Sequence, residues 1–556
     1  MNNRIALANA LFPEVNQTVA DIEKRYPERQ LPIGAAVTRF APSPTGFLHT
    51  GSLFTSMIAK KVAEQSGGVF FIRLEDTDAK REISGSGETL ITELHEFGVY
   101  PDEGYLGTIE KGAYGPYKQS DRALIYHTVI KQMVIDGIAY PCFATPEELD
   151  ALRAEQEKNK IVPGYYGIYA TYRDLPVKEA MERVKRGDKF VMRFKSHGSH
   201  ENKLPVHDLI RGDLELTEND QDIVILKGDG LPTYHFAHVV DDHFMKTTVV
   251  TRGEEWLSSL PIHIEMFNAL GWKAPDFAHL PVIMKLDNGN KRKLSKRKDP
   301  EAAVSYFLAD GYPPSALIEY LMTIANSNFE EWRAANPLAP RQDFRFAFDK
   351  MSLDGALFDI MKLKFIAREI LSRETAAKIT IEARLYAAQY DRRLYDLIIN
   401  DQDYFESIMN IEREKENPRK DYEKFSDIFE LVKFFYRDFY AQIIAGELPF
   451  NPLFNHEVIS QVLRDIQESI SLNLTEEEWF SGLKEIGEHR HFAPSGKIFK
   501  ANRDKYIGHI GDVAEMLRIV ITGSKQSPNL YYVLKVLGIE EVKARLGIMI
   551  DKLSQS

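Results

Sequence analysis

The sequence has a single cysteine, Cys142, among its 556 residues. One thiol cannot close an intramolecular disulfide, and it cannot supply two thiolates to a metal site. Because disulfides form in oxidising compartments, the near absence of cysteine favours a reducing, cytoplasmic setting.

Long apolar runs are also missing. No window offers the roughly 18 consecutive apolar residues that a membrane-spanning helix needs, so no membrane partner is expected. The first residues lack a clear basic region, and Glu14, Asp21 and Glu23 argue against a transit peptide. Residues 1–33 are therefore interpreted as a short extension of unknown use.

An excess of positive charge is absent as well. The net charge is −12, which argues against non-specific binding to nucleic acid, although a local basic groove is still compatible with it. With 44% hydrophobic and 27% charged residues, the composition is that of a globular protein with ample core material. The length suggests about three or four domains.

The first third of the chain predicts an α/β fold. Residues 35–41 suit a buried strand, the apolar spacing between Ser52 and Ser66 is helical, and residues 69–74 suit a second strand. Strand, helix and strand in this order form a right-handed βαβ unit of a parallel sheet. Functional groups in such sheets lie at the carboxyl ends of strands, so the loops 42–51 and 75–78 are candidates.

Further along, the pattern changes twice. Residues 115–205 are less regular, and strand-like segments then return at 189–195, 222–227 and 246–252, followed by a helix near 255–270. We expect the sheet to resume after an insertion. After about residue 350 the strands vanish and helical periodicity dominates; Thr475 and Glu478 form a capping box.

The loop after the first strand, "RFAPSPTGFLHTG" (39–51), is rich in small residues and proline. Such a turn lets the backbone approach a ligand, and the N-terminus of the following helix suits phosphate. His49 could donate a hydrogen bond to that phosphate. The structural alternative is an ordinary strand–helix turn with a capping histidine.

A second candidate is the basic segment 291–300. Six of the eight residues from Lys291 to Lys298 are Lys or Arg. Mobile cations of this kind can gather the charge of a polyphosphate leaving group. The alternatives are a basic surface loop or a nucleic-acid patch.

Together these two segments resemble the paired signature of class I aminoacyl-tRNA synthetases: His49-Thr50-Gly51-Ser52, and Lys293-Leu294-Ser295-Lys296-Arg297. The resemblance is closest to glutamyl-tRNA synthetases of the bacterial type and covers about 36–556. It is carried by "RFAPSPTGFLHTG" (39–51), "FIRLEDTD" (71–78), "GPYKQSDR" (115–122), "DGLPTYHFAHVVDDH" (229–243), "TRGEEWLSSLPIH" (251–263), "KLSKRKD" (293–299), "LFDIMKL" (357–363) and "LRIVITG" (517–523). Ser52 replaces the second His of the general class pattern, as is common in the glutamate branch.

The resemblance implies an α/β Rossmann-type parallel-sheet catalytic domain with an inserted α+β acceptor-binding domain, followed by an all-α C-terminal anticodon-binding half. The expected divisions are an N-terminal extension (1–33), the first half of the catalytic domain (34–114), the inserted acceptor-stem-binding domain (115–205), the second half of the catalytic domain (206–285), a stem-contact region with the KLSKR loop (286–370), and a helical anticodon-binding domain (371–556).

It also implies the reaction of a glutamate–tRNA ligase. L-glutamate and ATP, accompanied by Mg²⁺, give glutamyl-adenylate and pyrophosphate, and the glutamyl group then passes to the 3′-terminal ribose of tRNA(Glu). With the net charge at −12, tRNA binding would depend on local basic patches. The family is expected to be cytoplasmic and monomeric.

Site residues follow from the same resemblance. Glutamate has two carboxylates and an ammonium group, so Arg39 and Arg252 are natural carboxylate partners and Glu75 a natural ammonium partner. The full expected sets are, for glutamate, Arg39, Ala41, Ser43, Glu75, Tyr234 and Arg252; for ATP, His49, Gly51, Ser52, Glu255, Lys293, Leu294, Ser295 and Lys296; and, as catalytic residues among these, His49, Gly51, Lys293 and Lys296. Arg73 and Asp76 are set aside as residues that pair or cap.

Two other functions compete with this interpretation. A glutaminyl-tRNA synthetase usually has Asp-Asp-Thr-Asn where this chain has Glu75-Asp76-Thr77-Asp78, and its C-terminal half is usually β-barrels. A non-catalytic tRNA-binding paralogue could keep the fold while losing ATP ligands, but His49, Lys293 and Lys296 are present. The sequence leaves open whether tRNA(Gln) is also charged and which helical residues read the anticodon.

Zinc is predicted to be absent. Many bacterial relatives begin a zinc site with a C-x-C pair, but here Ala144 follows Cys142 at the second position, and residues 164–174 hold no Cys. A structural zinc site needs about four ligands, so Cys142 is expected to be a small buried residue instead. Elemental analysis of protein purified without a tag should find no stoichiometric zinc. A content of about one zinc per chain would contradict the prediction.

Overall fold

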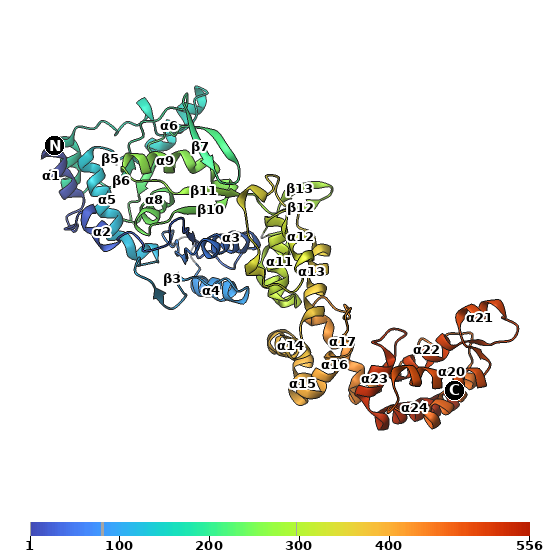
Figure 1. Ribbon diagram of the computed structural model, residues 1–556. Helices are drawn as coiled ribbons and strands as arrows, with labels where there is room; N and C mark the ends of the chain where they lie inside the picture. The colour runs from blue at the N-terminus through green and yellow to red at the C-terminus, as the bar shows by residue number, and fades with distance from the viewer. Residues whose placement is uncertain (1, 79–82, 296, 556) are drawn as a thin grey trace. The chain divides into compact units, whose positions relative to one another are not determined.

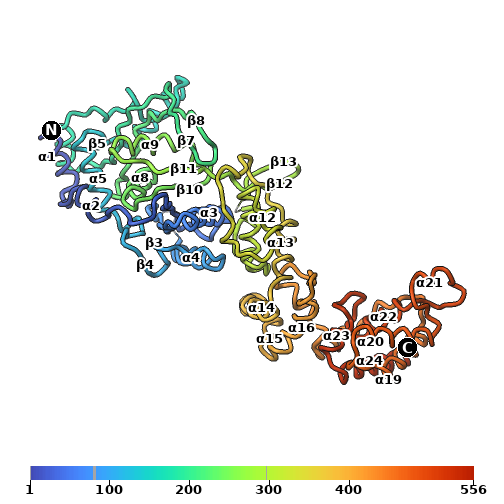
Figure 2. Tube along the Cα trace, in the orientation of Figure 1, coloured from blue at the N-terminus to red at the C-terminus, as the bar shows by residue number. Residues whose placement is uncertain are grey.

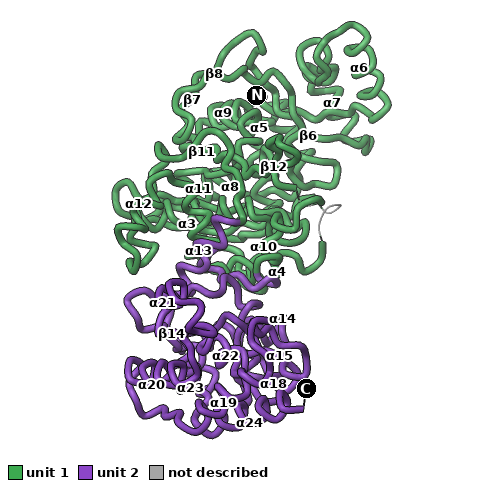
Figure 3. Tube along the Cα trace, turned by 90° about the vertical axis from the view of Figure 1, so that its right-hand side faces the viewer, with its two compact units in different colours: residues 1–307, 317–360 green, residues 308–316, 361–556 purple. Residues whose placement is uncertain are grey.

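The computed structural model describes residues 2–78, 83–295 and 297–555. The chain consists of two compact units (Figure 3). The first consists of residues 1–307 and 317–360, and the second of residues 308–316 and 361–556. The first unit is built on a parallel sheet and the second on helices, as the sequence predicts.

The expected βαβ unit is confirmed. Strands β1 (Val37–Phe40) and β2 (Val69–Ile72) pair in parallel, and α3 (Thr50–Ser66) connects them. Strand β2 also pairs in parallel with β3 (Glu103–Tyr105). Strand β3 pairs in the antiparallel sense with β4 (Glu110–Lys111), which is the edge strand.

His49 caps the start of helix α3, and Gly67 caps its end. Gly67 adopts a left-handed φ of 69°, which suits glycine. The next residue, Gly68, is required by a close approach to the neighbouring strand. A Cβ placed there would lie 1.9 Å from the carbonyl oxygen of Ala36. These two glycines allow the chain to turn directly from the helix into β2.

The second half of the parallel β-structure is a separate four-stranded sheet, in which β10 (Val249–Gly253) and β11 (Asp276–Leu280) pair in parallel (Figure 1). Thr248, just before β10, connects the halves, because its amide donates to the Val37 carbonyl (2.9 Å) and its hydroxyl accepts from the Val37 amide (2.8 Å). A hairpin of β7 (Lys203–Asp208) and β8 (Gly212–Thr217) extends this half beyond β11.

Fewer of the later strand-like segments join the parallel sheet than the sequence predicts. Of the three strand-like segments, only 246–252 joins the parallel sheet. The other two form β6 (Val191–Phe194) and β9 (Val224–Leu226). Strand β6 pairs in the antiparallel sense with both β5 (Ala139–Cys142) and β9, in a separate three-stranded sheet. Strand propensity indicates an extended backbone but not its hydrogen-bonding partner, so the prediction was wrong on this point.

The described residues 2–33 are a packed part of the first unit. Helices α1 (Asn2–Leu11) and α2 (Val19–Arg25) lie beside α5 (Ala123–Asp136), as Figure 2 shows. The buried side chains of this segment are Leu7, Ala8, Leu11, Phe12, Val15, Ile22 and Tyr26. Lys131 donates to the Val15 carbonyl (2.9 Å), and the Tyr26 hydroxyl donates to the Gly115 carbonyl (2.7 Å).

The remaining helices up to residue 335 follow in chain order. They are α4 (Ser86–Glu96), α6 (Pro146–Lys158), α7 (Val177–Arg186), α8 (Tyr234–Phe244), α9 (Leu260–Ala269), α10 (Val304–Asp310), α11 (Pro314–Ala325) and α12 (Phe329–Ala335). In the described part of the chain no helix is long and apolar enough to cross a membrane.

The second unit is helical around one hydrophobic core. Its helices are α13 (Ile360–Arg373), α14 (Ala376–Tyr390), α15 (Arg392–Asn400), α16 (Gln402–Met409), α17 (Ile428–Val432), α18 (Arg437–Ala445), α19 (His456–Ser469), α20 (Glu476–His489), α21 (Gly496–Ala501), α22 (Ile510–Thr522), α23 (Leu530–Leu537) and α24 (Ile539–Gln555). The capping box of Thr475 and Glu478 is confirmed at the start of α20. Strands do not vanish entirely, because β14 (Phe492–Ala493) and β15 (Gly508–His509) form a short parallel pair.

The packing of the N-terminal segment generates a stability prediction. Ile22 is fully buried (0% exposed), so Ile22→Ala should lower the free energy of unfolding of the first unit by about 2–5 kcal/mol. Urea unfolding followed by tryptophan fluorescence measures this loss. Ile33→Ala is the matched control, because Ile33 is fully exposed and its truncation should cost less than about 0.5 kcal/mol. Equal midpoints for the two variants would show that the segment contributes nothing to the core.

Candidate active site

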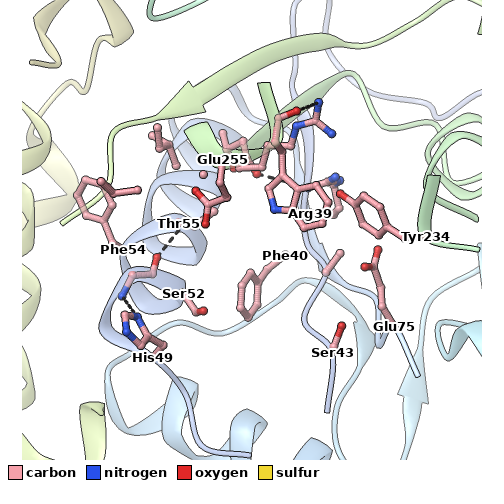
Figure 4. A pocket seen from close by; sticks show the side chains of 18 of the residues that line it. Arg39, Phe40, Ser43, His49, Ser52, Phe54, Thr55, Glu75, Tyr234 and Glu255 are labelled. Carbon is pink, nitrogen blue, oxygen red and sulfur yellow. Dashed lines mark hydrogen bonds between the residues drawn. The ribbon is translucent and has the colours of Figure 1, made fainter. Parts of the chain in front are cut away.

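A cavity of about 1100 Å³ lies at the carboxyl ends of β1, β2, β10 and β11, within the first unit (Figure 4). Ligands of open parallel sheets bind at this edge. The cavity is lined by nearly all of the expected site residues: Arg39, Ala41, Ser43, His49, Gly51, Ser52, Glu75, Tyr234, Arg252, Glu255, Lys293 and Leu294. Ser295 is not among the lining residues, and Lys296 lies outside the described residues.

One wall of the cavity rests on a buried charge network. Asp242 accepts from Arg39 Nε (3.2 Å) and from Arg73 Nη1 (2.7 Å), and Arg73 Nη2 donates to Glu75 (3.1 Å). Burial raises the pKa of Glu75, and this effect exceeds the lowering by Arg73 and Arg39. Arg73, which the sequence interpretation set aside as a pairing residue, is fully buried and holds both carboxylates.

Helix α8 supplies Asp242 together with two other groups of this wall. Tyr234, His238 and Asp242 are spaced four residues apart, so they share one helix face. His238 Nδ1 lies 2.9 Å from an Asp242 oxygen, and the His238 ring stacks on that of Tyr234 with centroids 5.8 Å apart. The sequence reasoning found Tyr234 but missed His238 and Asp242, although the four-residue spacing was the signal that could have indicated them.

Arg252 is the second buried cation of the cavity, with 5% of its surface exposed. Its Nε donates to His279 (2.9 Å), and its Nη1 donates to His263 (3.1 Å). Burial and the nearby charge of Arg39 lower the pKa of Arg252, and Tyr234 only partly offsets them. Two arginines facing one cavity favour an anionic ligand.

At the other end of the cavity, His49 begins α3. Its Nδ1 accepts from the Gly51 amide (2.9 Å), so the neutral ring carries its proton on Nε2. The amides of Ser52 and Leu53 donate to the His49 carbonyl (2.8 and 2.9 Å). The backbone amides expected to face a phosphate, those near Gly51, are thus hydrogen-bonded within the turn itself.

The basic segment begins on the hairpin of β12 (Met284–Asp287) and β13 (Asn290–Lys293). Lys293 Nζ lies 2.9 Å from Glu255, and both side chains are about half exposed, at 56% and 48%. Burial works to raise the pKa of Glu255, but the hydrogen bond and charge of Lys293 outweigh it and hold that pKa below its usual value. Arg292, by contrast, holds the loop in place. It donates to Asp299 (2.6 Å), and Asp299 also accepts from the Ser295 amide (2.8 Å).

Cys142 is buried, as predicted. It is 1% exposed and packs with Tyr140, Tyr165 and Ala170, and its Sγ donates to the Tyr165 hydroxyl at 3.4 Å. Among the residues that the structure describes, no group of three or more His, Cys, Asp or Glu side chains could hold a metal ion.

Several known proteins are similar to this chain in sequence and structure. A family model for the catalytic domain of class I tRNA synthetases (E and Q) matches residues 35–364, and a model for an anticodon binding domain matches residues 400–550. The chain is 44% identical over 541 residues to a glutamate–tRNA ligase of Clostridium perfringens strain 13, covering 97% of this chain and 99% of that one. A glutamate–tRNA ligase of Sorangium cellulosum is 38% identical over 570 residues, with 98% of each chain covered. The crystal structure of a glutamate tRNA ligase from Elizabethkingia meningosepticum in complex with its amino acid superposes with a TM-score of 0.74 at 28% identity, covering 93% of this chain and 100% of that one.

The buried histidine of the charge network generates a pH prediction. Burial lowers the pKa of His238 from 6.5 to about 3, although Asp242 opposes the shift. The unfolded chain therefore binds a proton between these values that the folded chain does not, so stability present above pH 6.5 is lost as pH falls toward 3. In His238→Gln the slope of unfolding free energy against pH should decrease by up to about 1.4 kcal/mol per pH unit.

Urea unfolding between pH 4.5 and 7 measures that slope. The matched control is His207→Gln, because the His207 side chain is 64% exposed and also faces an aspartate, Asp213. A change of slope that the His238 variant shows and the His207 variant does not is assigned to the buried ring. An unchanged slope in the His238 variant would show that His238 titrates alike in the folded and unfolded chains.

Proposed function

The chain belongs to the glutamate–tRNA ligases among the class I tRNA synthetases, and we propose that its cavity binds L-glutamate and ATP side by side. One observation carries this assignment of the cavity. Two buried arginines, Arg39 and Arg252, face the same cavity as the buried carboxylate Glu75. Glutamate has the complementary charges, two carboxylates and one ammonium group.

The amino-acid end lies around Tyr234, Glu75 and Arg39, which Figure 4 shows across the cavity from His49 and Ser52. Arg39 and Arg252 would each bind one carboxylate, and Glu75 would accept from the ammonium group. Ser43 and Tyr234 offer hydroxyls, and Ala41 lines the floor. Glutamine lacks the second carboxylate and would leave one buried arginine without an anion, which opposes its binding.

The ATP end lies at the start of α3 and beside the β12–β13 hairpin. Phosphate oxygens can accept hydrogen bonds from His49 Nε2, the Ser52 hydroxyl and Lys293. The Gly51 amide already donates its hydrogen bond to His49 Nδ1. Glu255 would release Lys293 and turn toward the nucleoside. Leu294 lines the same end, and Ser295 and Lys296 follow it in the chain.

The first step is an in-line attack of a glutamate carboxylate oxygen on the α-phosphorus of ATP. The bond to the pyrophosphate oxygen breaks, and Lys293 with His49 would stabilise the charge that develops there. No covalent intermediate with the enzyme is needed. Mg²⁺ would neutralise phosphate charge and be held mainly by phosphates and water.

In the second step a ribose hydroxyl at the 3′ end of tRNA attacks the glutamyl-adenylate and releases AMP. The proposed contacts are residues 115–205 for the acceptor stem, 286–370 for the stem, and 371–556 for the anticodon. We propose a monomer that acts in the cytoplasm on tRNA(Glu). Charging of purified tRNA(Glu) and tRNA(Gln) in parallel distinguishes single from dual tRNA scope.

The test is ATP–pyrophosphate exchange that depends on glutamate and tRNA. Lys293→Ala should lower kcat by about 100-fold, because it removes a cation that stabilises the leaving group, and Lys296→Ala should do so as well. Lys60→Ala is the matched control. It removes another Lys–Glu pair of the first unit (2.7 Å to Glu64) at a place away from the cavity, and should retain activity. An inactive wild type in the presence of the correct tRNA would refute the function.

A further inference from the structure

Two buried polar side chains lie behind Arg252 and do not line the cavity. They are His279, on β11, and Asp208, at the end of β7, and both are 0% exposed. The sheet places the three residues in a row. Arg252 is the register partner of His279 between β10 and β11, and Asp208 pairs with Phe277 between β7 and β11.

The direction of each hydrogen bond in this row is fixed by chemistry. Arg252 Nε donates to His279 Nε2 at 2.9 Å, and arginine has no acceptor, so His279 Nε2 carries no proton. The neutral ring must therefore carry its proton on Nδ1, which donates to Asp208 Oδ2 at 2.6 Å. The order of donation is Arg252 to His279 to Asp208.

Asp208 is itself fixed by the backbone. Its Oδ1 accepts from the amides of Ile210 and Arg211 (both 3.0 Å), and its Oδ2 accepts from the amide of His279 (3.0 Å) as well as from the ring. Every one of these groups donates to the carboxylate. Asp208 thus requires two acceptor oxygens, and only the carboxylate form supplies them.

A second histidine acts on the same guanidinium group. His263 Nδ1 accepts from Arg252 Nη1 at 3.1 Å, so its Nε2 carries the proton and donates to His235 Nδ1 at 3.1 Å. Two neutral imidazoles therefore hold the guanidinium plane. Arg39 is held differently, because its Nε contacts the carboxylate of Asp242 at 3.2 Å.

The difference matters for anion binding. A carboxylate in direct contact with a guanidinium offsets part of its charge and so weakens its attraction for an anionic ligand without abolishing it, whereas an imidazole lone pair fixes its orientation without offsetting its charge. In this row the negative charge of Asp208 lies one imidazole ring away from Arg252. Burial lowers the pKa of His279, which helps keep the ring neutral beside the arginine.

We infer that Asp208 and His279 are positioning residues that orient Arg252 toward the carboxylate of bound glutamate while leaving its charge unpaired. The inference rests on the proposed function, since it takes Arg252 as a glutamate-binding residue. It predicts a defect in glutamate binding that does not extend to ATP.

Asp208→Asn tests the row with an isosteric change. If the amide oxygen accepts from Ile210 and Arg211, the amide NH₂ faces His279 Nδ1 and shifts the ring proton to Nε2, where it opposes Arg252 Nε–H. In the pyrophosphate exchange assay the KM for glutamate should rise at least tenfold, and the KM for ATP should stay within twofold. The matched control is Asp213→Asn, which makes the same substitution in an exposed Asp–His pair (2.7 Å to His207) on the adjoining β7–β8 hairpin. Both of its KM values should equal those of the wild type.

A second pair of variants decides the matter if Asp208→Asn does not fold. His279→Leu removes the acceptor for Arg252, whereas His279→Gln offers an amide oxygen in its place. The glutamate KM should therefore rise more in the Leu variant than in the Gln variant. Partial rescue of this kind is not expected from a residue that only fills space.

The outcomes separate the inference from the proposed function. If the wild type charges tRNA with glutamate but the folded variants match Asp213→Asn, the inference is overturned and the function stands. If the KM values for glutamate and ATP rise together, the row is merely structural and the inference is again overturned. A wild type that does not activate glutamate overturns the function and, with it, this inference.

Discussion

The structure of the active-site wall depends on the balance of buried charge around Asp242. An isolated ion in a protein interior is costly, so each buried guanidinium needs a partner. Asp242 accepts from both Arg39 and Arg73, and these arginines hold its pKa well below the usual value against the opposing effect of burial. Because Arg39 belongs to β1 and Asp242 to α8, this balance also fixes α8 against the sheet.

The same balance explains why Glu75 points into the cavity. Arg73 contacts Asp242 and Glu75, and its Nε lies 3.6 Å from Asp241, so one buried cation is shared by three carboxylates. The same network extends from Asp241 to Arg122, whose nitrogen lies 2.6 Å from an Asp241 oxygen at 0% exposure. Neighbouring residues of α8, Asp241 and Asp242, therefore fasten the helix to two different parts of the unit.

Arg252 differs from Arg39, Arg73 and Arg122, each of which contacts a carboxylate. Its nitrogens meet imidazole rings, and its pKa is lowered where those of Arg73 and Arg122 are raised. Fully paired cations stabilise a fold, whereas a cation backed by neutral groups retains its attraction for a ligand. The cavity thus combines one arginine fixed by a carboxylate with one that is oriented but not neutralised, opposite the carboxylate of Glu75.

The sequence alone determined the βαβ unit, the place of the loops at the strand ends, the helical second half and the buried state of Cys142. These depend on local spacing, on turn residues or on a motif, and each can be recognised within a few dozen residues. The motifs also indicated which side chains would meet in the cavity, and the structure brings together all of those it describes except Ser295.

Only the tertiary structure decided which strands pair and which buried groups face one another. The segments 189–195 and 222–227 have strand propensity, but they form β6 and β9, which pair with each other, and β6 pairs with β5 in a sheet separate from the parallel one. Arg73 and Asp242 are 169 residues apart in the chain, and Asp208 and His279 are 71 apart. Local propensity contains no information on such contacts, because they are selected by the cost of leaving a buried charge or a buried donor without a partner.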